Sequence, residues 1–453
     1  MFGLKLAITM RTKKGISVGL VLFVIFHASA QDSIVSLSLS QSCQLGIEKN
    51  VNVKNAGLEQ QKTRYQLKEA QSKLYPQVEG YSNFSYYYAI PKMILPGEIF
   101  GQTGLIPVEI GTKYDWSSGF KASQLLYSQS YFTSLKLAQQ MQTMGELTFQ
   151  QKKEEVVYQV SQVYYLCQTT NKQIEQLKLT MQNTERLLEI AKLQSGNGVI
   201  RKIDYSRVSV NKNNLQTQID NLDQLYQQQL SLLKYLIGIK VNTIVNLSDS
   251  LSFSPVESFP ELPDINSRIE LKLLDKQSEV TLLNRKINQQ LYLPTLSGFG
   301  QYYYQGQRNE FDFLKGGNDK FFKVGFVGLS LNIPVFDGYE KHSKTLQHDI
   351  ELLQLQNTRK SASEYLTKEF MDAVKQYNNN FNALLRQQEN IKVAQETYAI
   401  SLQGYRQQVV PLSDLLMSDN SLTEARLSYF NALLQLKNAE LALKKAKGEL
   451  LNY

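Results

Sequence analysis

Hydrophobic positions along this chain follow a seven-residue repeat over unusually long stretches. Two interleaved series lie in one stretch: Val160, Cys167, Ile174, Met181 and Leu188, and Val163, Thr170, Leu177, Thr184 and Ala191. A third series repeats the same step further along: Phe370, Tyr377, Leu384, Ile391 and Tyr398. This register is typical of helices packed as coiled coils. Because Cys167 occupies a seam position, we expect it to be a small buried hydrophobe.

The predicted helices are far longer than those of ordinary globular domains. Four stretches without glycine or proline cover Glu146–Ser195, Val199–Ile237, Tyr339–Gln403 and Leu412–Lys447. Allowing for an interruption at Gly145, the first long helix is predicted to begin near Ser123 and to run for about 70 residues, or roughly 100 Å. Such lengths favour a coiled coil over a globule.

Two aromatic segments of alternating polarity lie between the helices, and each predicts a pair of strands. The four strands are predicted over residues 78–90, 114–126, 295–304 and 322–333. In the first strand, Val78, Phe84, Tyr86 and Tyr88 share one face, and Glu79, Asn83 and Ser85 share the other. Tyrosine-rich strands of about 10 residues, apolar outside and polar inside, are typical of a transmembrane β-barrel. The alternative is a soluble β-hairpin resting on a coiled coil.

The two halves of the chain repeat each other. Pro76 corresponds to Pro294, and Asp204 corresponds to Asp414. Each half reads as helix, strand, strand, very long helix, reverse turn and helix, and the loop Pro91–Thr112 is the longer of the two strand-to-strand loops. An internal duplication of this kind divides the chain into structural repeats. We predict a first repeat over 31–238, a proline-containing linker over 239–267, and a second repeat over 268–453.

The first 30 residues predict a secretory signal peptide. Lys5, Arg11, Lys13 and Lys14 precede the apolar run Ile16–Phe26, and the run is followed by Ala28-Ser29-Ala30. The run is too short to span a bilayer, which needs about 20 apolar residues. An amphipathic first helix is the alternative. We therefore expect an exported mature protein.

Composition excludes several functional classes. The chain has 49 Lys+Arg against 41 Asp+Glu, and four of the cations precede the apolar run. The remaining charge is small and unclustered, so no nucleic-acid partner is expected. Two cysteines and three histidines leave little for metal chemistry, and we expect no cofactor and no disulfide. Because H-E-x-x-H, P-loop and G-x-G-x-x-G motifs are absent, and no clustered acid/base set suggests an envelope hydrolase, we predict that the protein is not an enzyme.

The strand count implies that copies assemble. Single-chain barrels in outer membranes need at least about eight strands, and hydrocarbon does not tolerate open sheet edges. Three copies would supply 12 strands and 12 helical columns if the shorter helices stack end to end beside each long one. Two or four copies remain open from the strand count alone. The predicted fold class is thus an all-α coiled-coil barrel joined to a transmembrane β-barrel.

The chain resembles the TolC-type outer-membrane efflux protein family. The motifs that carry the resemblance are Leu74-Tyr75-Pro76-Gln77-Val78, Tyr292-Leu293-Pro294-Thr295-Leu296 and the run Val327–Gly338 before the second long helix. The resemblance implies a homotrimeric channel-tunnel, with its barrel in outer-membrane lipid and its helices reaching through the periplasm. It implies the passive exit duct of a tripartite efflux pump or type I secretion system, docked to a periplasmic adaptor (membrane fusion protein) and an inner-membrane transporter.

The resemblance also places two helix-to-helix turns at the periplasmic tip. The first turn contains Gly196, Gly198, Arg201 and Asp204, and its glycines are expected to end the long helix and to permit positive φ. In the family, this glycine region meets the adaptor. The second turn departs from the pattern. There Gln408 stands in place of glycine and Pro411 intervenes before Asp414.

A closed resting tip is a further implication, with Asp414 and Tyr405 as the candidate constriction. Three copies of Asp414 would repel one another and attract cations. Val410 stands where the family often has a basic residue, so a lock at the tip would need other bonds, for example from Arg406. For Asp204 and Asp414, helix capping is the alternative.

The main competing function is a periplasmic structural or adaptor coiled coil whose hairpins stay soluble. Fractionation would separate the two, because the duct must be extracted from the outer membrane as a trimer.

Overall fold

The computed structural model describes residues 35–252, 263–315 and 321–451, and the predicted signal peptide (1–30) lies outside them. The helices are α1 (Leu39–Lys49), α2 (Val51–Ser72), α3 (Gln129–Gly196), α4 (Lys202–Leu236), α5 (Ile269–Gln290), α6 (Glu340–Arg406) and α7 (Leu412–Lys447). The strands are β1 (Val35–Leu37), β2 (Gln77–Tyr86), β3 (Lys92–Pro96), β4 (Leu105–Glu109), β5 (Tyr114–Tyr127), β6 (Val245–Leu247), β7 (Thr295–Arg308) and β8 (Phe322–Asn332). Two 3-10 turns complete the elements, η1 (Gly97–Phe100) and η2 (Ile265–Ser267).

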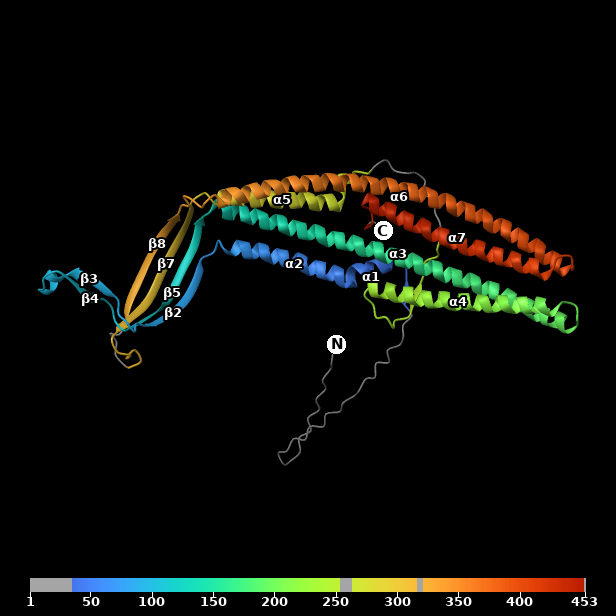
Figure 1. Cartoon of the computed structure of the whole chain (residues 1–453), viewed down its shortest axis with the longest axis horizontal. Coiled ribbons are helices and arrows are strands. Elements are labelled where there is room, and N and C mark those ends of the chain that lie inside the picture. Colours follow the sequence, from blue (N-terminus) through green and yellow to red (C-terminus); the bar gives the residue numbers. More distant parts are fainter. Residues whose placement is uncertain (1–34, 253–262, 316–320, 452–453) are drawn as a thin grey trace, which may run out of the picture.

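The molecule is long, with a β-sheet at one end and helices over the rest of its length (Figure 1). Helices α2, α1 and α4 follow one another along α3, and α5 and α7 lie along α6. Helix α3 contains 68 residues and α6 contains 67, so each is about 100 Å long. The predicted end-to-end stacking of shorter helices beside a long one is confirmed.

The long helix α3 begins later than the sequence predicts and is not interrupted. Strand β5 continues to Tyr127, and the hydroxyl of Ser128 then caps α3 by accepting a hydrogen bond from the amide of Tyr131. Gly145 lies inside the helix, where a Cβ atom would come within 2.9 Å of Thr63 Oγ1 on α2. Glycine at this position therefore allows close helix packing and does not break the helix.

The heptad seams form the helical core. Eight of the ten predicted seam positions on α3 are buried, and Val160 and Cys167 have no exposed surface. The largest cluster joins α1, α2, α3, α4, β1 and β6 near the middle of the molecule. Cys43 belongs to the same cluster, with its Sγ 3.4 Å from Ser161 Oγ. Burial raises the pKa of the Cys167 thiol to about 12, and no disulfide joins these two described cysteines.

Strands β2, β5, β7 and β8 form one antiparallel sheet in that order, and the pair β5–β7 joins the two halves of the chain. The register confirms the predicted faces: Glu79 opposes Lys121 on the polar face, and Phe84 opposes Trp116 on the apolar face. Tyr88, predicted to lie in the first strand, is beyond it, because β2 ends at Tyr86. Strand β7 continues to Arg308, four residues past its predicted end.

The predicted loop Pro91–Thr112 contains a second, separate hairpin. Strands β3 and β4 pair with each other and form their own two-stranded sheet. The turn between them contains η1 and the positive-φ residues Gly101 and Gly104. In Figure 1 this hairpin projects beyond the end of the main sheet, away from the helices.

A buried arginine fastens the start of the second repeat to the end of α7. The side chain of Arg268 is 3% exposed, and its Nη1 donates to the carbonyl of Ala446 at 2.8 Å. Its other nitrogens donate to the carboxylate of Glu270 at 2.8 and 3.2 Å, and Glu369 lies 3.7 Å away. The predicted linker 239–267 that precedes this contact contains β6 and η2, and residues 253–262 within it lie outside the described residues.

Candidate functional site

The two helix-to-helix turns lie together at the end of the molecule opposite the sheet (Figure 1). Their backbones make the same hydrogen bonds. The amides of Val199 and Ile200 donate to the carbonyl of Gln194 at 2.8 and 3.4 Å, and those of Val409 and Val410 donate to the carbonyl of Gly404 at 2.9 and 3.2 Å. The internal duplication therefore extends to the atomic geometry of the turns.

The left-handed position of each turn is filled by a different residue. Gly198 has φ 72° and Gln408 has φ 60°. Left-handed backbone costs a residue with a Cβ roughly 1–2 kcal/mol, so the second turn holds strain that the first does not. Gly196 differs from its prediction: it is the last residue of α3 and is not among the positive-φ glycines of the described chain. Only Gly198 needs the conformational freedom of glycine here.

The two aspartates at the tip have different surroundings. The side chain of Asp204 is only 12% exposed and is paired with Arg201 at 3.1 Å and Arg207 at 3.5 Å. Asp414 is exposed, and its Oδ1 accepts from the Ser413 hydroxyl at 3.1 Å. Both lie in the first turn of a helix, α4 and α7, where a negative charge is favoured. Pro411 is the N-cap of α7.

Side chains of the helices that flank both turns pack against each other. The cluster consists of Ala191, Val208, Leu412, Leu415 and Leu416. Beside it the Tyr405 hydroxyl donates to Gln194 Oε1 at 3.1 Å, which links α6 to α3. The side chain of Arg406 makes no hydrogen bond or ion pair within the described chain, and the bond at the tip comes from Tyr405 and Gln194. No motif or spacing points to Gln194, because its role depends on the packing of α3 against α6.

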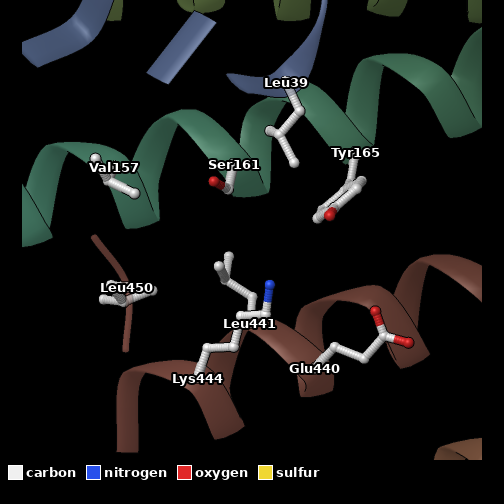
Figure 2. A pocket seen from close by; sticks show the side chains of 8 residues that line it. All are labelled: Leu39, Val157, Ser161, Tyr165, Glu440, Leu441, Lys444 and Leu450. Carbon is white, nitrogen blue, oxygen red and sulfur yellow. The ribbon is translucent and has the colours of Figure 1, made fainter. Parts of the chain in front are cut away.

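A cavity of about 420 Å³ opens between the two hairpins next to this link. Its lining residues come from α3, α6 and α7 and from the turn after α6: Asn183, Thr184, Arg186, Leu187, Ile190, Gln194, Tyr398, Leu402, Tyr405, Arg406, Gln408, Leu415 and Asp419. A second cavity lies near the middle of the molecule, where Ser161 and Tyr165 of α3 face Glu440 and Leu441 of α7 (Figure 2). Its volume is only about 50 Å³, so it is too small for a ligand of ordinary size.

Asp419 is the chemically unusual group of the tip cavity. Its carboxyl is partly buried and has no hydrogen bond or ion pair to the part of the chain that the structure describes. Burial raises its pKa to about 6, and the charge of Arg426 on the same helix acts in the opposite direction. Arg186, Tyr398, Tyr405 and Arg406 line the same cavity from α3 and α6. Asp419 is not recognisable from the sequence, because a single aspartate on a long helix carries no motif.

The packing of the tip is expected to depend on pH through Asp419. A raised pKa means that the packed tip favours the protonated carboxyl, so this stabilisation is full below the ordinary pKa and is lost as the pH rises through about 6. The distribution of distances between spin labels at positions 193 and 409 should become broader as the pH rises from about 5 to about 8. Asp419→Asn should abolish this change, whereas Asp414→Asn should keep it. An unchanged pH response in Asp419→Asn would contradict the assignment.

The sheet at the other end separates polar from apolar side chains. On the polar face Lys121 pairs with Glu79 at 2.9 Å, and Asp115 accepts hydrogen bonds from Gln305 and Gln307. On the apolar face, rings gather at the end distant from the helices: Phe84, Tyr86, Tyr114, Trp116, Phe311, Phe313 and Phe321. Exposed rings also mark the sheet–helix junction: Tyr75, Tyr127, Tyr292, Phe336 and Tyr339. Two aromatic girdles flanking an apolar band are typical of a strand surface that faces lipid.

Neither a membrane-spanning helix nor a metal site emerges from the described residues. Their helices contain no apolar window long enough to cross a bilayer. Within residues 35–252, 263–315 and 321–451, no three His, Cys, Asp or Glu side chains are grouped to hold a metal ion.

Comparison with known proteins identifies a matching family and several solved structures of similar fold. The family model described as outer membrane efflux protein matches residues 43–238 and 268–449. The fold is similar to that of CusC, at a TM-score of 0.73 and 16% identity over 91% of this chain and 92% of that one. It is also similar to the CmeC outer membrane channel of Campylobacter jejuni (TM-score 0.73, 16% identity, 91% and 85% covered) and to the MtrE outer membrane channel of Neisseria gonorrhoeae (0.72, 15%, 90% and 88%). A search of curated proteins returned no match.

Proposed function

The chain belongs to the outer membrane efflux protein family, and we propose that this protein is the exit duct of a tripartite efflux pump or type I secretion system. The family match also confirms the resemblance to TolC-type channels. The protein is an outer-membrane efflux channel with a helical periplasmic part. Membership of an efflux protein family supports a channel and not an enzyme. This location sets aside the competing model of a soluble periplasmic coiled coil.

The observation that supports a duct is the open, two-faced sheet. Strands β2 and β8 are its free edges, and lipid does not tolerate free edges. In our proposal, β8 of one copy pairs with β2 of the next, and three copies close a 12-stranded barrel. The face with Glu79, Lys121 and Asp115 then lines the lumen, and the face with Phe84 and Trp116 meets lipid. Mass measurement of the detergent-solubilised protein tests this directly, because a monomer would contradict it.

The first turn is proposed as the adaptor-docking site. Apart from Gly198 and its two chain neighbours, no atom lies within 4 Å of the position that a Cβ would occupy, so the backbone is open to a partner. The proposed docking residues are Gly196, Gly198, Arg201 and Asp204, joined by Gln408 and Pro411 of the neighbouring second turn. An inner-membrane transporter would provide the energy, and the channel would remain passive.

Gly198→Trp is expected to abolish efflux while the trimer remains in the outer membrane. The bulky ring would fill the open space where the adaptor is proposed to sit. Gly198→Asn is the matched control, because asparagine accepts left-handed backbone at little cost and adds little bulk. Drug or dye efflux from cells that depend on this channel would be compared with trimer abundance. Undiminished efflux in the tryptophan variant would show that the turn is only a loop.

Asp414 and Tyr405 are proposed to hold the resting tip closed. Tyr405→Phe removes the hydrogen bond to Gln194, and Asp414→Ala removes the exposed charge of each copy. Each change should raise resting single-channel conductance or weaken cation block in planar bilayers. Tyr398→Phe is the control, since that hydroxyl has no hydrogen bond within the described chain. Wild-type conductance in both test variants would place the constriction elsewhere.

A further inference from the structure

The β3–β4 hairpin exposes large apolar side chains without a partner in the described chain. Exposed fractions reach 66% for Ile94, 69% for Ile99, 53% for Phe100 and 74% for Leu105. Opposed residues of the ribbon share a face, so Ile94 and Leu105 lie on one face and Met93 and Val108 on the other. Both faces are therefore apolar. An isolated two-stranded ribbon is at best marginally stable in water, so these faces call for a protein or lipid partner.

Each edge of the hairpin carries a proline that weakens strand addition. The amide of Gly97 donates to the carbonyl of Gly104, and that of Ile110 donates to the carbonyl of Pro91. Because hydrogen-bonded and non-bonded pairs alternate in an antiparallel ribbon, residues 92, 94 and 96 and their partners direct their backbone nitrogens outward. Pro96 and Pro107 occupy two of these outward positions, one on each edge. Proline has no N–H to donate, so an added strand would lose one hydrogen bond on either edge, and the exposed apolar side chains are the stronger contact surface.

Lipid hydrocarbon does not reach this hairpin. Strand β2 contains ten residues, about 33 Å when extended, and when tilted it crosses the apolar band of about 25 Å by itself. The aromatic cluster around Phe84 and Trp116 lies at the end of the sheet distant from the helices, which is where the outer interface falls. The hairpin begins after Tyr88 and therefore projects into water. Its apolar faces need a protein partner.

Neighbouring copies are the partner within reach. A 12-stranded barrel has a radius of roughly 12 Å, and five extended residues span about 17 Å. A hairpin rooted at the rim is thus long enough to meet its two equivalents above the barrel axis. The charged pair Lys92–Glu109, with its atoms 3.5 Å apart, lies at the root, and the apolar residues lie toward the tip.

We propose that the β3–β4 hairpins of three copies pack on one another and cap the outer mouth of the channel. The proposal rests on the trimeric duct proposed above and adds a second constriction at the end opposite the periplasmic tip. Opening then requires the three apolar tips to separate, for example when cargo arrives from inside.

Site-specific cross-linking tests the cap. Cys43 and Cys167 have no exposed surface, so they should not react with a short bifunctional maleimide added to the native protein. Leu105→Cys, near the tip, should join copies several-fold more efficiently than Lys92→Cys, since the roots of the hairpins would be about 20 Å apart. The double variant Ile94→Lys, Leu105→Lys should raise single-channel conductance, because like charges would separate the tips.

The mass of the solubilised protein separates the two proposals. A monomeric mass would contradict the duct itself. A trimeric mass in which Leu105→Cys cross-links no better than Lys92→Cys would overturn the cap alone. Wild-type conductance of the double lysine variant would also overturn it. If Leu105→Cys is captured by a different protein in whole cells and never by another copy, the partner is foreign and the cap is likewise excluded.

Discussion

Gly119→Ala is expected to reduce the abundance of the outer-membrane trimer by about tenfold or more. An added methyl group overpacks the sheet, and overpacking costs about 1–3 kcal/mol of stability. A Cβ at this position in β5 would clash with the carbonyl oxygen of Tyr302 and with Tyr303 Cα on β7. Both are backbone atoms, so no side-chain movement relieves the clash. The pair β5–β7 is the one that joins the two halves of the chain.

Gly80→Ala is the matched control for this prediction. Gly80 lies in the same sheet, but its added Cβ would meet the ring of Phe120 at 3.4 Å, and the nearest backbone atom, the carbonyl oxygen of Gly119, would be at an ordinary 4.0 Å. The two variants therefore differ in whether backbone or a movable side chain is contacted. Trimer abundance in outer-membrane fractions is the measurement. Equal abundance of the two variants would show that the β5–β7 spacing adjusts to an extra methyl group.

Arg268→Ala is expected to lower the free energy of unfolding by about 1.5–3 kcal/mol, because it removes the hydrogen bonds that a buried cation makes to the half-buried carboxylate of Glu270. Burial raises the pKa of Glu270, but the hydrogen bond and charge of Arg268 outweigh this effect, so the pKa of Glu270 is lowered. The stabilisation is therefore present at neutral pH and lost as the pH falls through that lowered pKa. The carbonyl of Ala446 would also lose its donor.

Denaturant unfolding of the solubilised protein, followed by helical circular dichroism, measures this loss. Arg359→Ala is the control, because Arg359 pairs with Asp275 on the surface, where solvent screens the charges. It should cost far less than Arg268→Ala. Comparable losses for the two arginines would mean that Arg268 acts as an ordinary surface charge in solution.

The helical part of the fold could be predicted because its signal is repeated many times. Val160 and Cys167 are two of ten seam positions on one helix, and an error at one position does not change the period. The limits of elements were less certain, since tertiary contacts decide them. Strand β5 extends to Tyr127 because β7 continues to pair with it, and Gly145 stays helical because Thr63 packs against it. Neither contact is visible in the local sequence.

The candidate site could be predicted only in part for the same reason. Duplication of the chain located both turns and hence Gly198 and Asp414. Gln194 and Asp419 were missed, because each matters only once α3 lies against α6 and α7. The β3–β4 hairpin was also missed, since its prolines and glycines read as a loop. In the structure the prolines occupy positions where a strand edge faces water.

The order of pairing in the sheet has a consequence for how the chain folds. The hairpins α3–α4 and α6–α7 connect residues that are near in sequence, and such contacts form early. Strand β5 instead pairs with β7, so Tyr114 can pair only after Arg308, far along the chain, has been synthesised. This pairing closes a long loop, and the loss of conformational entropy on closing it opposes formation of the sheet. Until β7 is available, the apolar faces of β2 and β5 remain exposed to water. Aggregation therefore competes most strongly with folding while the second half of the chain is still being synthesised. A factor that shields the first two strands would help the folding of this protein most.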